Sequence, residues 1–289
     1  SGTCLTQTTI FMGAVDLLGC ALPVKSHRHL FLCYSPVVTA PALPPHPHRS
    51  LGDVPSSLPL TGERTVPGIA REQYWFARHE VVYRWLAPRC AGQHVVEAGS
   101  GEGYGARILQ QAGARVVAVD YDEAAITHSA ATYPLPHVRA NLAALPFGRV
   151  DAVVSLQVIE HLWDLRHFLS ETRRIATWTC LSTPNRLTFS PGLSRGQKPT
   201  NPFHVEEFDA PQLQELVREA GFTDIAMFGV RHGPRLAARP GLIAEQIDAA
   251  VSGTWPAELE QFVAGVRTDD FLVTDTDIDT CLDLVVVAS

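Results

Sequence analysis

Short runs of apolar residues alternate with amphipathic segments along the chain from residue 94 onward. The runs HVVEA and RVVAVD, at 94–98 and 115–120, predict two buried strands, and the segment 104–112 between them predicts a helix that Gly113 ends. Five further strands are expected, at 137–140, 151–155, 178–182, 222–230 and 282–288. Because helices alternate with these runs, the pattern predicts an α/β fold with a doubly wound, mostly parallel sheet of seven strands.

The clearest helix of the chain begins after Asp209. Asp209 is expected to cap it and Gln212 to complete a capping box, while apolar residues within 213–220 form one face. About fifty residues, at 231–280, separate the last two strands, and such a long connection is usually functional. We expect this segment, together with 186–204, to form a lid over the substrate.

Residues 1–58 differ in pattern from the rest of the chain. They hold apolar patches without a clear period and then a stretch dense in Pro, His and Ser, which predicts an extension and linker before one catalytic domain at 59–289. His46 and His48 could bind a metal, but the composition favours a solvated linker. The longest apolar stretch, 10–24, contains an aspartate and is shorter than the roughly 20 residues of a membrane span. No Lys or Arg precedes it, so neither a span nor a signal peptide is predicted.

Charge and cysteine content narrow the class of ligand. The formal net charge is -7 and no run of Lys or Arg forms a basic stripe, which disfavours nucleic acid as a partner. The six cysteines are scattered without a C-x-x-C pair, so we expect free thiols in the cytoplasm rather than a zinc or redox centre. The expected partner is a small molecule or an oligosaccharide; the oligomeric state is not predicted.

Three glycines, Gly99, Gly101 and Gly103, lie between the first strand and the first helix. Their missing side chains let the backbone turn tightly and approach a nucleotide closely. Gly101, Gly103 and Ala106 also have the spacing of dinucleotide-binding loops, so a nicotinamide or flavin enzyme is an alternative. Glu97 favours another ligand, because its carboxylate would repel a pyrophosphate and attract the ammonium and sulfonium groups of S-adenosylmethionine.

Four residues after the next two strands complete a candidate nucleotide site. Asp120 ends the second strand, where a carboxylate can accept both ribose hydroxyls. Tyr121 could pack on an adenine, although ordinary loop packing explains it too. Asn141 and Leu142 follow the third strand and could flank the other side of the ring and its amino group.

These segments together resemble the class I S-adenosylmethionine-dependent methyltransferases, through E-x-G-x-G-x-G, VDYD, ANLAALPF and DAVVSLQVIEHL in that order. The resemblance implies a Rossmann-like sheet with an antiparallel last strand and S-adenosylhomocysteine as the cofactor product. It assigns the methionine part to Glu97, Gly99 and Gly101, the ribose to Asp120, the adenine to Asn141 and Leu142, and the loop beneath the cofactor to Gln157. Asn141 stands where Asp is commoner, but its amide oxygen can still accept a hydrogen bond from the adenine amino group.

A narrower resemblance, to actinobacterial sugar O-methyltransferases, extends from residue 59 to the end. It rests on LTGERTVP, EQYWFARHEVVY, VIEHLWD, STPNR, NPFH and HGPRL. It implies the methylation of a hydroxyl in mannose- or glucose-containing polysaccharides such as those of mycobacteria. Two alternatives stay open: a methyltransferase for a small natural product or quinone-like ring, and a protein that binds the cofactor without turnover.

Methyl transfer to a hydroxyl needs an oxygen in line with the methyl group and a base for the proton. His161 follows the fourth strand, at the carboxyl edge of the sheet where ligands bind in such folds, and its unperturbed pKa of about 6.5 suits a base. His161 is therefore the first candidate base, although it could equally cap or pack against the next helix. Glu160 is the second candidate.

Four other residues are candidates for contact with the substrate. His204 and His232 lie in later loops and could point into the same cleft, although a structural hydrogen bond explains each of them. Tyr74 and Trp75 lie on the helix expected before the first strand, where aromatic rings could stack on a sugar. An amphipathic core helix explains these two rings equally well.

A divalent metal is conceivable, because some sugar methyltransferases orient hydroxyls on a cation. The ligand set would be His161, His204 and Glu206, but their spacing gives no support and no metal site is predicted.

Two segments, at 148–150 and 175–178, look shortened relative to the family pattern. The second lacks the usual Pro-Gly-Gly turn and leaves few residues to reverse the chain between helix and strand, where such connections use about two to six. We therefore expect a displaced fifth strand, and with it a displaced STPNR loop.

Overall fold

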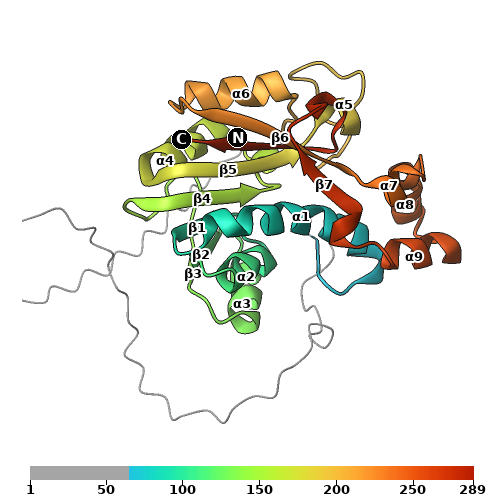
Figure 1. Ribbon diagram of the computed structural model, residues 1–289, viewed down its shortest axis with the longest axis horizontal. Helices are drawn as coiled ribbons and strands as arrows, with labels where there is room; N and C mark the ends of the chain where they lie inside the picture. The colour runs from blue at the N-terminus through green and yellow to red at the C-terminus, as the bar shows by residue number, and fades with distance from the viewer. Residues whose placement is uncertain (1–64) are drawn as a thin grey trace, which may run out of the picture. The chain divides into compact units, whose positions relative to one another are not determined.

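The computed structural model describes residues 65–289, which fold around one central sheet (Figure 1). Its eight strands lie in the order β3-β2-β1-β4-β5-β8-β6-β7. They are β1 (His94–Ala98), β2 (Arg115–Asp120), β3 (His137–Arg139), β4 (Val150–Leu156), β5 (Ala176–Pro184), β6 (Ile225–His232), β7 (Phe271–Thr274) and β8 (Asp283–Ala288). Strands β1 to β5 run parallel to one another, β8 runs antiparallel to both β5 and β6, and β7 runs antiparallel to β6.

Helices cover both faces of the sheet, as the doubly wound prediction requires (Figure 1). They are α1 (Gln73–Cys90), α2 (Tyr104–Gln111), α3 (Glu123–Thr132), α4 (Leu165–Ile175), α5 (Arg186–Phe189), α6 (Ala210–Glu219), α7 (Pro234–Ala237), α8 (Leu242–Ser252) and α9 (Ala257–Ala264), with short 3-10 turns η1 (Ala70–Glu72), η2 (Ile159–His161), η3 (Thr268–Asp270) and η4 (Ile278–Thr280).

The two faces of the sheet have separate apolar cores. Leu86 of α1 and Leu109 of α2 pack in one core together with Val95 of β1. Phe168 of α4 and Val96 of β1 belong to the other. Successive residues of a strand point to opposite faces, so a strand that is covered on both sides must be apolar at both positions. This is why residues 284–288 of β8, LVVVA, form a continuous apolar run whose members alternate between the two cores.

The sheet has eight strands and not the seven expected from the sequence. The additional strand, β7, lies inside the segment 231–280 and pairs with β6 from Gly229 to His232. Its four residues, FLVT, were too few to show a strand period in the sequence. The same segment also contains three helices, α7, α8 and α9. The insertion is also packed: Val263 of α9 and Phe271 of β7 are buried in the same core as α1.

The expected displacement of the fifth strand is wrong. Strand β5 pairs in parallel with β4 from Val150↔Ala176 to Leu156↔Ser182. Helix α4 ends at Ile175, and Ala176 is already extended, so the chain reverses at the helix end without a loop. Ile175 and Ala176 are both buried. Apolar packing at the junction therefore replaces the longer turn.

Helix α6 begins as predicted. The Asp209 side chain accepts from the Gln212 backbone N–H at 3.0 Å, and the Gln212 side chain accepts from the Asp209 N–H at 3.2 Å, which is a complete capping box. The late strands β6 and β8 also lie close to the predicted ranges.

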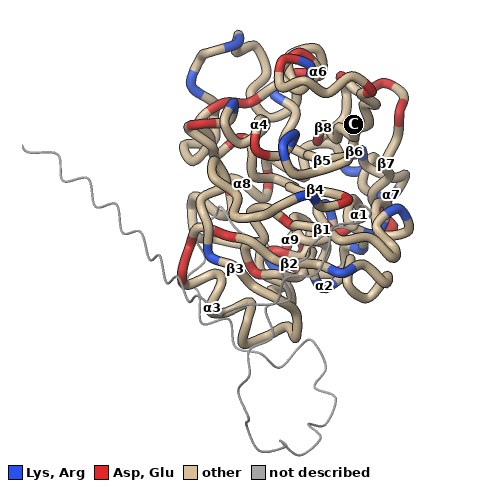
Figure 2. Tube along the Cα trace, turned by 90° about the vertical axis from the view of Figure 1, so that its left-hand side faces the viewer, with Lys and Arg blue, Asp and Glu red and all other residues tan. Residues whose placement is uncertain are grey.

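The predicted extension 1–58, with His46 and His48, lies outside the described residues. Within 65–289, no helix is both long and apolar enough to cross a bilayer. The three cysteines of this part, Cys90, Cys180 and Cys281, are free thiols as expected. In Figure 2, Lys and Arg are scattered among acidic residues rather than gathered into a stripe.

Candidate active site

The glycine loop joins β1 to α2 and is held by the second strand. The N–H groups of Gly99 and Ser100 both donate to the Val119 carbonyl, at 2.8 and 2.9 Å. Gly99, Gly101 and Gly103 have φ values of 81°, 49° and 82°, the left-handed region that glycine adopts without strain. A Cβ at Gly99 would meet the Val158 side chain, whereas one at Gly101 would meet nothing within 4 Å. The open side of Gly101 can therefore receive a ligand.

Glu97 lies beneath this loop and is completely buried. Neither carboxylate oxygen makes a hydrogen bond of ordinary geometry within the described residues, although the Tyr83 hydroxyl and the Ala106 N–H are close. Burial raises the Glu97 pKa to about 8, and these two neighbours offset the effect only in part. In the absence of a cation the side chain is therefore largely neutral at pH 7, and a cationic ligand would restore its charge.

Asp120 connects the second strand to the glycine loop. Its Oδ2 accepts from the Gly101 N–H at 2.7 Å, and its Oδ1 accepts from the Asp122 N–H at 2.9 Å. The ring of Tyr121 is exposed, with the Arg139 guanidinium 5.9 Å from its centre. These contacts hold a carboxylate and an aromatic face at the carboxyl edge of the sheet, beside the loop.

Asn141 and Leu142 lie in the turn after β3 and differ in exposure. Leu142 is buried, whereas Asn141 is exposed and its side-chain oxygen accepts from the Ala143 N–H at 2.9 Å. The amide N–H₂ of Asn141 makes no hydrogen bond within the described residues, so only its oxygen contributes to the turn.

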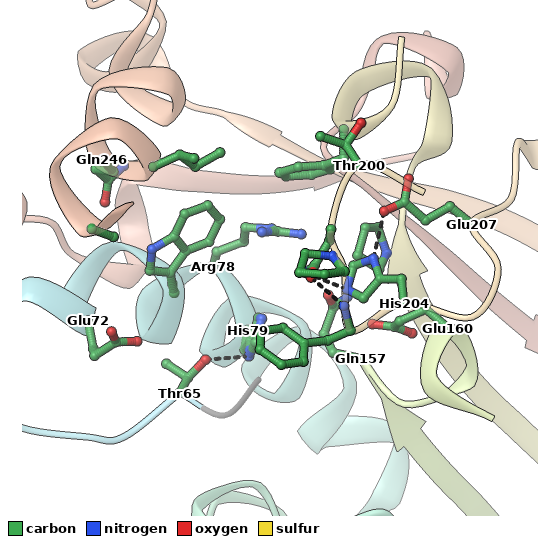
Figure 3. A pocket seen from close by; sticks show the side chains of 18 of the residues that line it. Thr65, Glu72, Arg78, His79, Gln157, Glu160, Thr200, His204, Glu207 and Gln246 are labelled. Atoms are coloured by element: carbon green, nitrogen blue, oxygen red, sulfur yellow. Dashed lines mark hydrogen bonds and ion pairs between the residues drawn. The ribbon is translucent and has the colours of Figure 1, made fainter. Parts of the chain in front are cut away.

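A cavity of about 500 Å³ opens beside the turn that follows β4 (Figure 3). Residues from α1, from η2, from the segment between α5 and α6, and from α8 line it. Of the residues singled out in the sequence, Trp75, Gln157, Glu160, His161 and His204 line this cavity. The glycine loop adjoins it, because Val158, next to Gln157, is the side chain that a Cβ at Gly99 would meet.

Gln157 has a strained backbone at the end of β4. Its φ of 57° is rare for a residue with a side chain and costs on the order of 1 kcal/mol. Its amide Nε2 donates to Ser182 Oγ at 3.1 Å and to Asp283 Oδ1 at 3.2 Å. These bonds hold Gln157 between the glycine loop and the cavity.

The predicted catalytic residues meet a histidine from a distant segment. Glu160 and His161 form η2, and the ring of His161 lies 5.0 Å from that of His204, centre to centre. His161 Nδ1 lies 3.1 Å from the Phe203 carbonyl oxygen, and His161 Nε2 lies 4.0 Å from Glu160 Oε1. Figure 3 shows Glu160, His204 and Glu207 close together on one side of the cavity. His161 and His204 therefore line the same cavity, whereas His232 does not.

Glu160 is buried, with 1% of its surface exposed. Burial raises its pKa to about 8; its own backbone N–H and the nearby Thr183 hydroxyl oppose that rise, and the nearby Asp283 adds to it. His204 donates from Nδ1 to Glu207 Oε1 at 2.6 Å, and Glu207 is itself buried.

Tyr74 and His232 do not line the cavity. The Tyr74 hydroxyl and His232 Nε2 form a 2.7 Å hydrogen bond with each other, and Tyr74 is completely buried. Both rings pack on Phe271 of β7. The pair joins α1 to the strand before the insertion, which is the structural role that the sequence left open.

The sequence analysis missed three charged residues at the site. Arg78 of α1 forms a two-point ion pair with Asp283 of β8, and both are buried. The rings of Trp75 and Phe189 lie 5.3 and 4.6 Å from the Arg78 guanidinium. The available signal was an arginine one turn after Tyr74 on an apolar helix face, and an aspartate in the apolar strand LDLVVVA. Glu207 was also missed, because a carboxylate in a loop carries no such pattern.

Comparisons with known proteins agree with this geometry. Residues 96–177 match the model of a family described as a methyltransferase domain. The chain is 51% identical over 250 residues to a probable S-adenosylmethionine-dependent methyltransferase of Mycolicibacterium smegmatis, an alignment that covers 81% of the chain and 96% of the relative. A Mycobacterium tuberculosis protein of the same description is 49% identical over 272 residues, covering 86% and 98%.

A solved structure shows the same fold. It is an S-adenosylmethionine-dependent methyltransferase of Thermotoga maritima, which matches 74% of this chain and 92% of its own with a TM-score of 0.52. The sequence identity is 16%, so this likeness concerns the fold alone.

Proposed function

Because the chain belongs to the S-adenosylmethionine-dependent methyltransferases, we propose that it methylates a hydroxyl of a mannose- or glucose-containing oligosaccharide. The observation that carries the proposal is the cavity beside the glycine loop, where aromatic rings and polar side chains face the same space. Trp75, Phe189 and Trp255 line it together with Gln157 and Glu160. Sugars present apolar C–H faces and hydroxyls at once, and such a lining suits both.

The residues around the glycine loop fit the methyl donor. Gly101 has an open side, Asp120 stands at the end of β2, and the Tyr121 ring is exposed for stacking. The assignment proposed for the cofactor is Glu97, Gly99, Gly101 and Gly103 for the methionine part, Asp120 for the ribose, Tyr121, Asn141 and Leu142 for the adenine, and Gln157 for the loop beneath it. S-adenosylmethionine supplies the methyl group and leaves as S-adenosylhomocysteine.

The acceptor oxygen is proposed to bind near η2. As its bond to the methyl carbon forms, the bond from that carbon to sulfur breaks, and the hydroxyl releases one proton. His161 is the first candidate for activating the hydroxyl, and Glu160 is the second. Both side chains line the cavity, and the turn that bears them adjoins the glycine loop through Val158.

A methylation assay with a labelled methyl donor and purified mannose or glucose oligosaccharides tests the proposal. We expect label in the sugar, a loss of cofactor binding in Asp120→Ala, and a loss of about 10²- to 10⁴-fold in rate in His161→Ala. The matched control is His167→Ala, since His167 is exposed on α4 and pairs with Asp164 at 2.7 Å. Rates of His167→Ala close to those of the unchanged enzyme are expected.

Two other outcomes would replace the sugar acceptor. Label in a small natural product or a quinone-like ring, and none in any sugar, would identify the same chemistry on another substrate. Cofactor binding without methylation of any acceptor, unchanged in His161→Ala, would identify a binding protein with little activity.

A further inference from the structure

Three side chains with metal-binding atoms converge on one wall of the cavity. Glu160 and His161 come from η2, and His204 comes from the segment between α5 and α6. One ligand atom from each lies within 4.8 Å of the other two. More than forty positions of sequence separate His161 from His204, so only the fold brings them together.

Each of the two histidines is oriented through its Nδ1. His161 Nδ1 donates to the Phe203 carbonyl at 3.1 Å, and His204 Nδ1 donates to Glu207 at 2.6 Å. An imidazole that donates from Nδ1 keeps its lone pair on Nε2. Metal-binding histidines show this arrangement, in which a carbonyl or a carboxylate takes the far N–H and turns Nε2 towards the ion.

His204 Nε2 carries a lone pair that the Asn201 amide uses in this structure, so an ion bound there would replace that hydrogen bond. This Nε2 accepts a hydrogen bond from the Asn201 amide at 2.9 Å, while the oxygen of the same amide accepts from the Phe203 N–H at 3.0 Å. The two bonds together fix the amide orientation, so Nε2 of His204 is an acceptor and not a donor.

Glu160 adds a buried carboxyl group to the two histidines. Its Oε2 is buried and makes no hydrogen bond of ordinary geometry within the described residues. Glu160 and Asp283 are both buried near the Arg78 guanidinium, but Arg78 is paired with Asp283. Burying a carboxylate without a cation bound to it costs free energy, and a divalent ion would stabilise the ionised form of Glu160.

We propose that Glu160, His161 Nε2 and His204 Nε2 bind a divalent transition-metal ion whose remaining positions face the cavity. Two imidazoles and one carboxylate suit manganese, iron, cobalt, nickel or zinc better than magnesium or calcium. Bonds of about 2.1 Å place neighbouring ligand atoms roughly 3 Å apart, whereas these atoms lie up to 4.8 Å apart, so each pair approaches by up to about 2 Å when the ion binds.

The ligand set differs from the one that the sequence suggested. Glu206 was the carboxylate considered there, in a set that the spacing did not support; it lies partly exposed, 3.9 Å from Arg195, and is absent from the converging group. Glu160, which lies beside His161 in the chain, takes its place.

The role of the ion rests on the proposed function. Three ligands on one side leave open positions, and an oxygen of the acceptor can fill one of them. An oxygen bound to such an ion loses its proton more readily. In the loaded enzyme His161 then activates the hydroxyl by holding the ion and not by taking the proton itself, which goes to solvent.

Titration of the chelator-treated, dialysed full chain with Co²⁺ tests the site, followed by visible absorption and calorimetry. We expect one ion per chain, with the absorption of a cobalt centre bound by nitrogen ligands. Glu160→Gln, His161→Gln and His204→Gln should each weaken binding more than about 100-fold, and Glu207→Gln, which acts through His204, by about 10- to 100-fold. Glu206→Gln is the matched control and should bind Co²⁺ as the unchanged protein does.

Thermal unfolding and S-adenosylhomocysteine affinity of each variant show whether the fold is intact, because that affinity does not depend on the ion. No stoichiometric Co²⁺ binding by the unchanged protein, binding that survives in His161→Gln, or an equal loss in Glu206→Gln would each overturn the proposal. Sugar methylation that continues without metal binding would contradict the proposed metal site and leave the proposed function intact. Metal binding without sugar methylation would support the site and count against the proposed acceptor.

Discussion

Glu97 is a buried carboxyl group beneath the glycine loop. The sequence suggested a carboxylate that selects a cation by its charge, whereas the folded chain buries it completely. Because burial raises its pKa to about 8, the folded protein without cofactor keeps the proton up to that pH, and the unfolded chain loses it near 4.5. Burial of Glu97 therefore opposes folding increasingly between these two values.

A proton should leave Glu97 when the cofactor binds. The ammonium of S-adenosylhomocysteine favours the carboxylate, so below pH 7 we expect about one proton released per cofactor bound and an affinity that rises by up to about tenfold per pH unit. Calorimetry in buffers of different ionisation enthalpy measures the proton. Glu97→Gln should bind with no such pH dependence, and proton release that persists in this variant would contradict the assignment.

Gly105 is a second residue whose role only the structure shows. A Cβ there would meet Glu97 Oε1 and the Tyr83 ring. Alanine usually stabilises a helix relative to glycine by up to about 1 kcal/mol, but overpacking costs about 1–3 kcal/mol. We therefore expect Gly105→Ala to lower the free energy of unfolding and to weaken cofactor binding.

The comparison for Gly105→Ala is Gly148→Ala. Position 148 has no atom within 4 Å of an added Cβ and no positive φ, so stability and binding should stay near those of the unchanged protein. Denaturant titrations and S-adenosylhomocysteine affinity give both quantities. An unchanged Gly105→Ala protein would show that α2 can shift to make room.

At the scale of elements, one buried ion pair connects the first helix to the last strand. Arg78 of α1 contacts both carboxylate oxygens of Asp283 in β8. Removing one partner leaves a buried charge, so Arg78→Leu and Asp283→Leu should each cost about 3–5 kcal/mol of unfolding free energy, and the double variant clearly less than the sum. Urea denaturation of the two single variants and the double variant measures the coupling free energy in this double-mutant cycle.

The exposed pair Arg166–Glu219 is the control for that double-mutant cycle. It links α4 to α6 at the surface, where such pairs contribute about 0–1 kcal/mol to the free energy of unfolding. Losses of unfolding free energy of similar size for the two pairs would show that water reaches Arg78 and Asp283, which contradicts their burial.

The elements themselves were mostly predictable, and the exceptions have physical causes. The buried strands and the capped helix α6 follow from apolar periods and one local capping box. Strand β7 was missed because four residues hold too little period, and its pairing partner β6 lies about forty positions earlier in the chain. The α4 to β5 junction was misjudged because packing at Ile175 replaced a turn, and a tertiary contact leaves no mark in local sequence.

For the whole molecule, cofactor binding should appear as added stability. A ligand at 100 times its Kd adds about 2.7 kcal/mol to the unfolding free energy, which corresponds to roughly 5–10 °C for a domain of this size. We expect S-adenosylhomocysteine to raise the Tm by this amount, and Asp120→Ala to lose the increase. NADH should have no effect; an increase with NADH would favour the dinucleotide enzyme that the glycine spacing left as an alternative.

The sequence by itself determined the class of fold and the position of the glycine loop between β1 and α2, because these depend on periods and spacings within short stretches of chain. It also identified His161 and His204 as candidates from their places after predicted elements. Only the tertiary structure decided which of the candidates share a cavity, that Tyr74 and His232 bond to each other instead, and that Glu160 rather than Glu206 joins the histidines. The reason is distance along the chain: contacts between segments tens of residues apart, and the burial that shifts their charges, exist only after the segments pack.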